Sequence, residues 1–210
     1  MRFKLSFLLL LSLIVSGCGG DKSDGSLPDM EFGGKSNYVL SDFDLNNEVR
    51  YWEIRMGPLP QSEWRDEIGY LYEYDVLYQF DETGLASLSE QEVQNLNDVD
   101  SQYGFSSECL PDYCPIYGVS VQGGSVVVIA SDQELLDFFG TINTHAELDV
   151  WLWAKSYQAR YYQEVEGGYM VVVAWDNLCG TSGEDLIFVD HNGVITKQRE
   201  ISRESYSGCV

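Results

Sequence analysis

Pairs of apolar runs joined by glycine-containing turns constrain the fold of this chain most strongly. "IYGVSV" and "SVVVIA" flank Gln122-Gly123-Gly124, "ARYYQEV" and "YMVVVAW" bracket Gly167-Gly168, and "DLIFVD" and "VITKQREI" bracket His191-Asn192-Gly193. Glycine and asparagine accept the positive φ angles that tight hairpin turns need. Because the two strands of a hairpin run antiparallel, the sequence predicts a mainly antiparallel sheet.

Two further stretches alternate as β-strands do. Residues 47–56, "NEVRYWEIRM", alternate until Gly57-Pro58 stops them. In residues 68–80, "IGYLYEYDVLYQF", one set of alternate positions is apolar or aromatic throughout. Successive side chains of a strand point to opposite faces, so this pattern predicts a row of aromatic side chains on one face.

Three capping signals predict short helices between the strands. Ser89 precedes Glu92, Ser131 precedes Glu134 and Thr144 precedes Glu147, each with the spacing of a capping box. Gly140 is placed to end the second helix. About eight strands, mostly linked by hairpins, and two or three short helices indicate an α+β domain, in which residues 125–210 could form a sub-unit.

The first residues have the features of an export signal. Arg2 and Lys4 precede an apolar run over residues 7–15, which is shorter than the roughly 20 residues that a membrane-spanning helix needs. The stretch Val15-Ser16-Gly17-Cys18 follows this run. The combination resembles the signal peptide and lipobox of bacterial lipoproteins. The alternative is an ordinary signal peptide with a coincidental cysteine.

The resemblance implies that residues 1–17 are removed and that Cys18 carries the lipid anchor. Gly19, in place of an aspartate, implies the outer membrane, with the protein facing the periplasm or the cell surface. The Gly-, Ser- and Asp-rich residues 18–37 are then a flexible tether, and residues 38–210 the globular domain. The run 125–210 resembles the C-terminal regions of uncharacterised bacterial lipoproteins, which implies no function.

The charge of the chain is strongly negative. It has 34 acidic residues against 12 lysines and arginines, and loss of Arg2 and Lys4 with the signal moves the formal charge from −22 to −24. Such a chain repels nucleic acid and anionic lipid headgroups, so both are poor candidate partners. Three explanations remain: a salty habitat or simple solubility, binding of divalent cations, and attraction to a basic protein or polycation.

Four cysteines remain beyond Cys18, and an even number in an exported protein predicts two disulfides. Three pairings are open to four cysteines. Proximity favours Cys109–Cys114, which leaves Cys179 to pair with Cys209. The alternative, a redox-active pair, normally has two intervening residues, whereas four separate Cys109 from Cys114.

One stretch has the spacing of a calcium loop. In "DFDLNNEVRYWE", Asp42, Asp44 and Asn46 occupy positions 1, 3 and 5, and Glu53 occupies position 12. This spacing brings several hard oxygen ligands to one point in an EF-hand loop. The strand-like pattern of residues 47–56 favours the alternative, which is an Asx-rich turn before a strand. Calcium is the only cofactor that the sequence suggests.

Aromatic residues suggest a contact surface. Tyr70, Tyr72 and Tyr74 share the predicted tyrosine face, and Trp151 and Trp153 lie nearly opposite each other on the third predicted helix. One of these two tryptophans is therefore expected at the surface, where it could bind a partner. The alternative is that the tyrosine face is ordinary sheet core.

No motif for catalysis is present: there is no P-loop, dinucleotide fingerprint, H-E-x-x-H or G-x-S-x-G. We therefore expect a lipid-anchored cell-envelope protein with a non-enzymatic binding or structural role. Its acidity makes a basic protein the expected partner, which suggests an inhibitor. The alternative is a glycan-acting or calcium-dependent envelope enzyme.

Overall fold

The computed structural model describes residues 31–32, 38–46, 48–57, 74–80, 84–107, 114–177 and 179–209 of the 210-residue chain. The predictions for Cys18, Tyr70, Tyr72 and Cys109 lie outside the described residues. Of Cys179 and Cys209, the backbone alone is described. Within the described ranges, no helix is long and apolar enough to cross a membrane.

In this part of the chain, ten strands form two five-stranded antiparallel sheets. Sheet A has the order β1 (Glu31–Phe32), β7 (Gln158–Val165), β8 (Gly168–Asp176), β9 (Cys179–Asp190) and β10 (Ile195–Cys209). Sheet B has the order β3 (Asp75–Gln79), β2 (Val49–Met56), β5 (Pro115–Gln122) and β4 (Ser106–Ser107), and β6 (Ser125–Ile129) also pairs with β5. The predicted α+β class with hairpin-linked antiparallel strands is confirmed.

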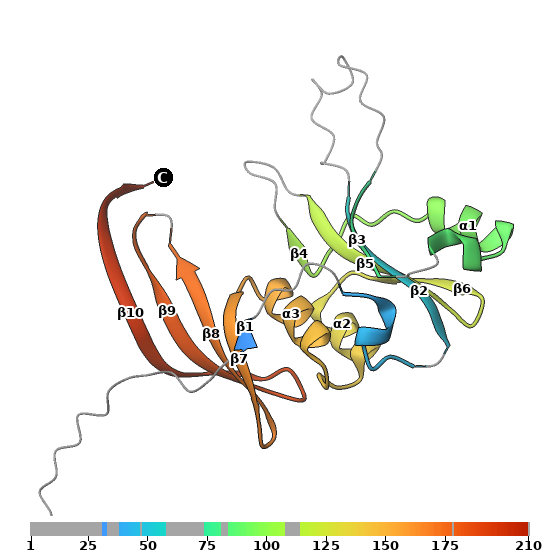
Figure 1. The fold of residues 1–210 in the computed structure, drawn as a ribbon. Coiled ribbons are helices and arrows are strands. Elements are labelled where there is room, and N and C mark those ends of the chain that lie inside the picture. The colour runs from blue at the N-terminus through green and yellow to red at the C-terminus, as the bar shows by residue number, and fades with distance from the viewer. Residues whose placement is uncertain are drawn as a thin grey trace, which may run out of the picture.

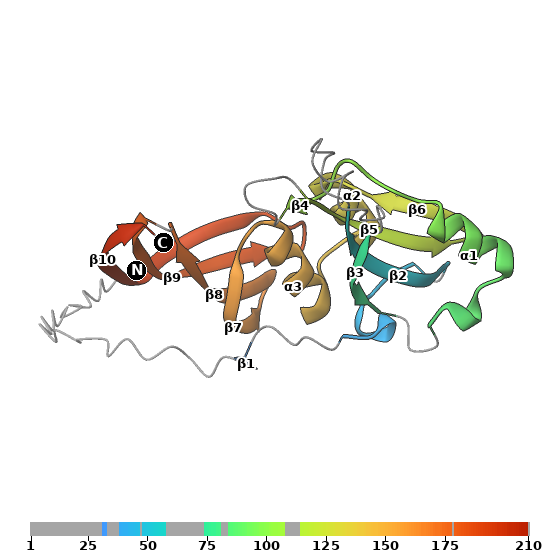
Figure 2. The ribbon, with the colours of Figure 1, turned by 90° about the horizontal axis from the view of Figure 1, so that it is seen from above.

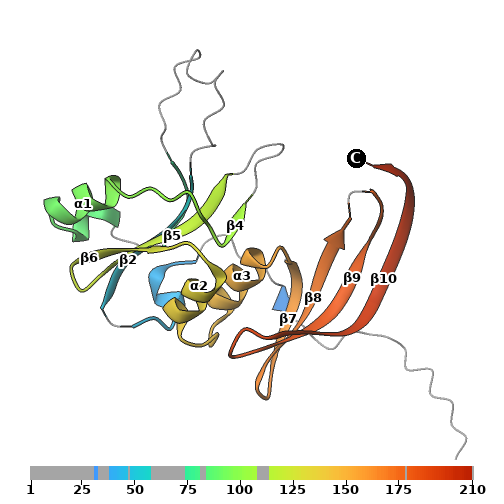
Figure 3. The same ribbon diagram turned by 180° about the vertical axis from the view of Figure 1, so that it is seen from behind.

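Three α-helices accompany these sheets: α1 (Glu90–Asn97), α2 (Asp132–Phe139) and α3 (His145–Ala154). Two short 3-10 helices, η1 (Leu40–Asp42) and η2 (Gly84–Ser87), complete the described elements. Figures 1 and 3 show α2 and α3 between the two sheets. Seen from above, sheet A, α3, sheet B and α1 follow one another across the molecule (Figure 2).

The predicted helix starts are confirmed. The side chains of Ser89, Ser131 and Thr144 each accept a hydrogen bond from the backbone N–H three residues later, which satisfies one of the free donors of the first turn. Gly140 follows α2 with φ 74°, as its prediction as a helix end requires.

The three predicted hairpins are also present. Gly123 and Gly124, with φ 54° and 85°, form the turn between β5 and β6. The β7–β8 turn lies at Glu166-Gly167, one residue earlier than predicted, and Gly168 begins β8. The turn between β9 and β10 contains the predicted Asn192-Gly193.

Of the strand predicted over residues 68–80, the structure describes β3. Within β3 the alternation of side chains between the two faces is interrupted. Ile54 pairs with Tyr78 and Arg55 pairs with Val76, so Leu77 is an extra residue in a β-bulge. Leu77 packs against the core, whereas Val76 and Tyr78 are exposed by 46% and 42%. The predicted continuous aromatic face is therefore interrupted in the part that the structure describes.

A single apolar core lies between the sheets. It joins Val171 and Ile187 of sheet A, Leu148 and Leu152 of α3, and Trp52 of sheet B. Since α3 lies between two sheets, it is buried nearly all round. The core thus extends on both sides of the boundary at residue 125.

The predicted boundaries of the tether and of the sub-unit do not coincide with the boundaries of the two sheets. β6, which begins the stretch 125–210, belongs to sheet B. Glu31 and Phe32, which lie inside the predicted tether of residues 18–37, pair with Tyr162 and Tyr161 of β7 as β1. This part of the predicted tether is therefore an edge strand of sheet A.

The far face of sheet B holds a smaller second cluster. Tyr51, Tyr117 and Val119 pack there with Leu96 of α1. β2 is therefore buried on both faces, with five consecutive buried residues. This is the pattern of a strand between two layers rather than of a strand with one face in water.

The backbone brings Cys179 and Cys209 opposite each other in the β9–β10 ladder. Directly opposed residues in antiparallel strands have Cα atoms about 4.5–5.5 Å apart, within the range that a disulfide spans. Cys114 takes part in a disulfide. The pairings 109–114 and 179–209 stay predictions that agree with this arrangement.

Candidate functional site

The four residues predicted to bind calcium do not converge on one point. Among the described residues, no three histidine, cysteine or acidic side chains are grouped so that they could hold a metal ion, and Asp42, Asp44 and Glu53 all belong to that set. The reason is that β2 begins at Val49, so the chain is already extended before it reaches Glu53. Asn46 lies in the turn that precedes this strand, as the alternative reading expected.

Each of these side chains has a local role instead. The carboxylate of Asp42 accepts a hydrogen bond from the backbone N–H of Val39 at 2.9 Å. The side-chain oxygen of Asn46 accepts one from the backbone N–H of Glu48 at 3.2 Å. Asp44 accepts a hydrogen bond from the side chain of Asn143 at 3.0 Å. The contact of Asn46 is that of an Asx turn, whereas the contact of Asp44 joins this segment to Asn143, 99 residues away.

Glu53 belongs to a buried charge network on the α1 side of sheet B. Its carboxylate accepts a hydrogen bond from Tyr51 and pairs with Arg55, whose Nε lies 2.5 Å from Oε1. Arg55 also donates to the carbonyl of Val99 at 3.0 Å. The guanidinium is fully buried and lies 3.7 Å from the ring centroid of Tyr74. Glu53 is thus committed to a structural ion pair.

The predicted aromatic contact residues also have structural roles. Trp151 is 3% exposed and donates to the carbonyl of Gly193 at 3.0 Å, so it is not the surface residue of the predicted pair. Trp153 is half-buried, with its ring against those of Tyr78 and Phe105. Both tryptophans are covered because α3 has a sheet on either side. Tyr74 is half-buried beneath Arg55.

The surface of sheet A that faces away from the helices is a stronger candidate, and we call it the open face. Figure 1 shows all three helices on the other side of this sheet. The strand register places cross-strand neighbours of β7, β8, β9 and β10 in rows on this face. The two middle rows contain the apolar residues Tyr161, Met170, Val172, Leu186 and Phe188, together with Gln163, Thr196 and Arg199. Val172 is fully buried among its neighbours. Tyr161 is the most accessible of the apolar residues, at 41%.

Acidic residues lie beside this apolar centre. Glu184 shares a row with Ala174 and Ser202, and the next row contains Asp176 and Glu204. These rows line a groove of about 620 Å³, in which Arg160 is the single cation among the described lining residues. Three carboxylates against one guanidinium give the groove a negative field, which attracts cationic groups.

A second cluster surrounds the first turn of α3. Glu147 is fully buried and accepts hydrogen bonds from the backbone N–H groups of Asn143 at 2.7 Å, Thr144 at 3.0 Å and Asp44 at 2.6 Å. Burial raises the pKa of Glu147, although these three donors oppose the increase. The carboxylate therefore caps α3 and fastens the segment after η1 to it.

The two histidines lie near this cluster in structural contacts. The Nδ1 atom of His191 lies 2.6 Å from the carbonyl of Ile142, and the backbone N–H of Ile142 donates to the carbonyl of His191 at 2.8 Å. The ring of His145 packs on that of Tyr162, with centroids 4.0 Å apart. His191 thus holds the β9–β10 turn against the chain between α2 and α3.

Residues of the open face were not among the sequence predictions. A signal for them was present in the hairpins, since the register of β7 with β8 and β9 follows from the turns and fixes which side chains share a row. What the sequence could not supply was the choice of face, because both faces of these strands contain apolar residues. Comparison of the chain with protein-family models, with curated proteins and with solved structures finds no match.

Proposed function

We propose that this protein is a lipid-anchored, non-enzymatic binding protein of the bacterial cell envelope, and that its open face receives a basic protein. The observation that carries the proposal is the open face itself, where an apolar centre with Tyr161 lies beside three carboxylates. Interfaces between proteins combine such an aromatic centre with a polar rim. The formal charge of −22 agrees in sign with the groove and selects a cationic partner.

The anchor belongs to the same proposal. The resemblance of Val15-Ser16-Gly17-Cys18 to a lipobox supports a lipid anchor at the membrane, and Gly19 supports the outer membrane. At the membrane, an acidic domain could bind basic proteins of the envelope and inhibit them or retain them there. Substitution of Cys18 by serine should abolish incorporation of a labelled fatty acid and membrane fractionation. Label that persists in this variant contradicts the anchor.

The binding proposal is tested by capture from envelope extracts with charge-reversed variants. Glu184→Lys with Glu204→Lys changes the groove, and Glu48→Lys with Asp75→Lys makes the same change of charge on exposed residues at sheet B. We expect the Glu184→Lys/Glu204→Lys variant to capture no basic partner. The Glu48→Lys/Asp75→Lys control should capture the partner as the wild type does. Equal loss from both variants means general attraction to an acidic protein and rejects the open face as the site.

Salt separates specific from general binding. Steering by the field should slow association as salt rises, because the Debye length falls to about 8 Å at physiological ionic strength. Dissociation should depend on the apolar centre, so Tyr161→Ala should speed it, in keeping with the role of buried aromatic anchors. A partner that leaves completely at about 0.3 M salt, whatever residue occupies position 161, is held by charge alone and contradicts the proposal.

A further inference from the structure

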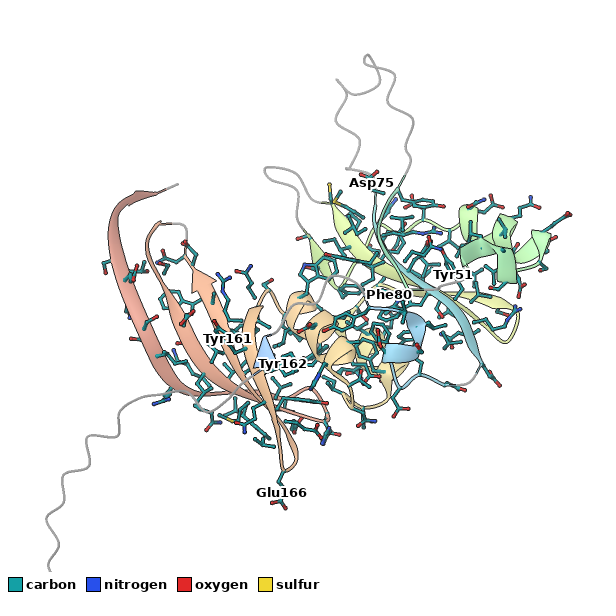
Figure 4. All side chains as sticks on the ribbon, in the orientation of Figure 1. Tyr51, Asp75, Phe80, Tyr161, Tyr162 and Glu166 are labelled. Atoms are coloured by element: carbon teal, nitrogen blue, oxygen red, sulfur yellow. The ribbon has the colours of Figure 1, made fainter. Side chains whose placement is uncertain are left out.

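A pocket of about 370 Å³ lies at the first turn of α3, on the opposite side of β7 from Tyr161. Its described lining includes Tyr38 and Asp42 from around η1, His145 of α3, Tyr162 and Glu164 of β7, and Tyr169 of β8. We call this the α3 pocket. In Figure 4 Tyr162 lies on the side of β7 toward the helices, whereas Glu166 lies at the tip of the β7–β8 hairpin. The volume is within the range of small-ligand sites.

Aromatic rings form the wall of the α3 pocket. The centroid of His145 lies 4.0 Å from that of Tyr162 and 5.7 Å from that of Tyr169. The hydroxyl of Tyr38 donates to Asp149, which ties its ring to α3. Rings held by such contacts present fixed π faces, which attract cations.

The hydroxyl of Tyr169 is the second feature. Tyr169 is 1% exposed and lines the α3 pocket, and its hydroxyl is not among the enclosed polar atoms of the described residues that lack a partner. Burial raises the pKa of Tyr169 to about 12, and the neighbouring carboxylates of Glu164 and Glu147 raise it further. The group therefore stays neutral, with a lone pair that can accept a hydrogen bond. Because Tyr169 lines the pocket, a ligand that supplied an N–H donor could form a hydrogen bond with this oxygen.

The charge around the pocket selects the sign of its ligand. Asp42 and Glu164 are exposed at its rim, and no lysine or arginine is among the described residues that line it. An anion at the helix N-terminus would compete with Glu147, whose carboxylate already binds the N–H groups of Asn143 and Thr144. The pocket is therefore suited to a cation.

We propose that the α3 pocket binds a primary alkylammonium group, with its alkyl part against Tyr162 and its N–H donors shared between Tyr169 and Glu164. The group could come from a free small amine or from a lysine side chain of a protein. A primary ammonium has N–H donors for the Tyr169 hydroxyl, whereas a quaternary ammonium has none. This site is separate from the open face and goes beyond the proposed function.

The test is titration of the full chain in detergent with butylammonium, followed by NMR shifts of the aromatic side chains. Saturable shifts at His145, Tyr162 and Tyr169 are expected, with weaker binding of tetramethylammonium and none of butanol. Tyr169→Phe keeps the ring and removes the hydroxyl, so it should weaken binding about tenfold. Glu164→Gln should also weaken binding and reduce its dependence on salt.

Matched controls use the same chemical changes outside the pocket. Tyr161→Phe lies on the other side of β7, and Glu166→Gln lies at the hairpin tip, so both should bind butylammonium as the wild type does. Shifts that do not saturate, or binding that Tyr169→Phe leaves unchanged, would overturn the proposal. Equal weakening by the two control variants would overturn it as well.

Two further arms distinguish the source of the amine. A lysine-containing peptide and the same peptide acetylated at lysine are compared with butylammonium. Binding of the unmodified peptide alone supports a lysine side chain, and binding of butylammonium without the peptide supports a small amine. The open-face variant Glu184→Lys with Glu204→Lys should retain amine binding, so that failure of the proposed function and failure of this site give different results.

Discussion

The two sheets of this protein differ in how many of their faces are covered. In sheet B, five consecutive residues of β2 and seven of the eight residues of β5 are buried. In sheet A, β7 has a single buried residue, Tyr162. A strand buried on both faces presents no side chains to a partner, whereas a strand covered on one face presents every second residue. β2 and β5 are thus the scaffold of sheet B, whereas β7 in sheet A carries surface residues.

The difference extends to the charges. Sheet B holds Glu53 and Arg55 where water does not reach them, so each depends on the other. In sheet A the pair of Arg203 and Glu200 lies in solvent, 3.9 Å apart. Removal of one partner leaves an unpaired charge, and that charge is costly only where water is excluded. Four comparisons, taken in order of expected effect, sharpen this contrast.

Arg55→Ala should have the largest effect because it leaves the carboxylate of Glu53 buried and unpaired. We expect a loss of about 3–5 kcal/mol in the free energy of unfolding, measured by chemical denaturation. The control is Arg203→Ala in sheet A, where an exposed pair should contribute less than about 1 kcal/mol. Equal losses in the two variants would contradict the division into scaffold and surface.

The proposed Cys179–Cys209 cross-link should rank second. It closes a loop of about 30 residues, and the chain-entropy treatment assigns it about 3 kcal/mol. Replacement of both cysteines by serine should raise hydrogen exchange in β9 and β10 more than in β2 and β5. Peptide mapping without reduction checks the pairing in the wild type, and free thiols or crossed pairs there would refute it.

Gly193→Ala probes the contact between the β9–β10 turn and the helices. Gly193 has φ 77°, and a Cβ atom would lie 2.8 Å from Leu136 and 3.0 Å from Trp151. Gly167 has φ 85°, and a Cβ atom there would have no neighbour within 4 Å. Gly167→Ala therefore measures the cost of the backbone conformation without a steric clash. Gly193→Ala should therefore exceed Gly167→Ala by about 1–3 kcal/mol of destabilisation. Equal losses in thermal or chemical unfolding would show that the turn does not pack tightly.

The smallest expected effect is a pH dependence of opposite sign at two helix caps. Burial raises the folded-state pKa of Glu147 above its usual 4.5, so its contribution to stability is present below pH 4.5 and is lost as the pH rises. Hydrogen bonds from Ser89 lower the pKa of Glu92, so its contribution is present above pH 4.5 and is lost as the pH falls.

Denaturation of the wild type, Glu147→Gln and Glu92→Gln across the pH range measures both slopes. Relative to Glu147→Gln, the wild type should lose stability as the pH rises above 4.5. Relative to Glu92→Gln, it should lose stability as the pH falls below 4.5. Slopes of the same sign would mean that burial does not dominate at Glu147.

Local chemistry accounts for the predictions that are confirmed. The caps at Ser89, Ser131 and Thr144 and the turn at Gly123-Gly124 depend on atoms a few residues apart, and such contacts are set by residue type and spacing. The same reasoning made Asn46 a turn residue as readily as a calcium ligand. The turn prevailed because β2 begins at Val49.

The burial of Trp151 has a tertiary cause. A helix with one covered face must expose one of two opposite tryptophans, but α3 has sheet A on one side and sheet B on the other. The sequence of α3 did contain a signal for this, because seven of its ten residues are apolar and lie all round the helix, which is the pattern of a buried helix. The β-bulge at Leu77 has a similar cause, because it depends on the register with β2 rather than on the alternation within β3.

By itself the sequence determined the antiparallel hairpins, the helix starts and the acidity, because each follows from residue type at short spacing. Only the tertiary structure decided that the strands divide into two sheets, which face of sheet A stays open, and that Asp44 and Glu147 meet across 103 positions. The reason is physical, because the arrangement of the elements is the one that buries the most apolar surface. That amount depends on all the elements together and not on any one segment.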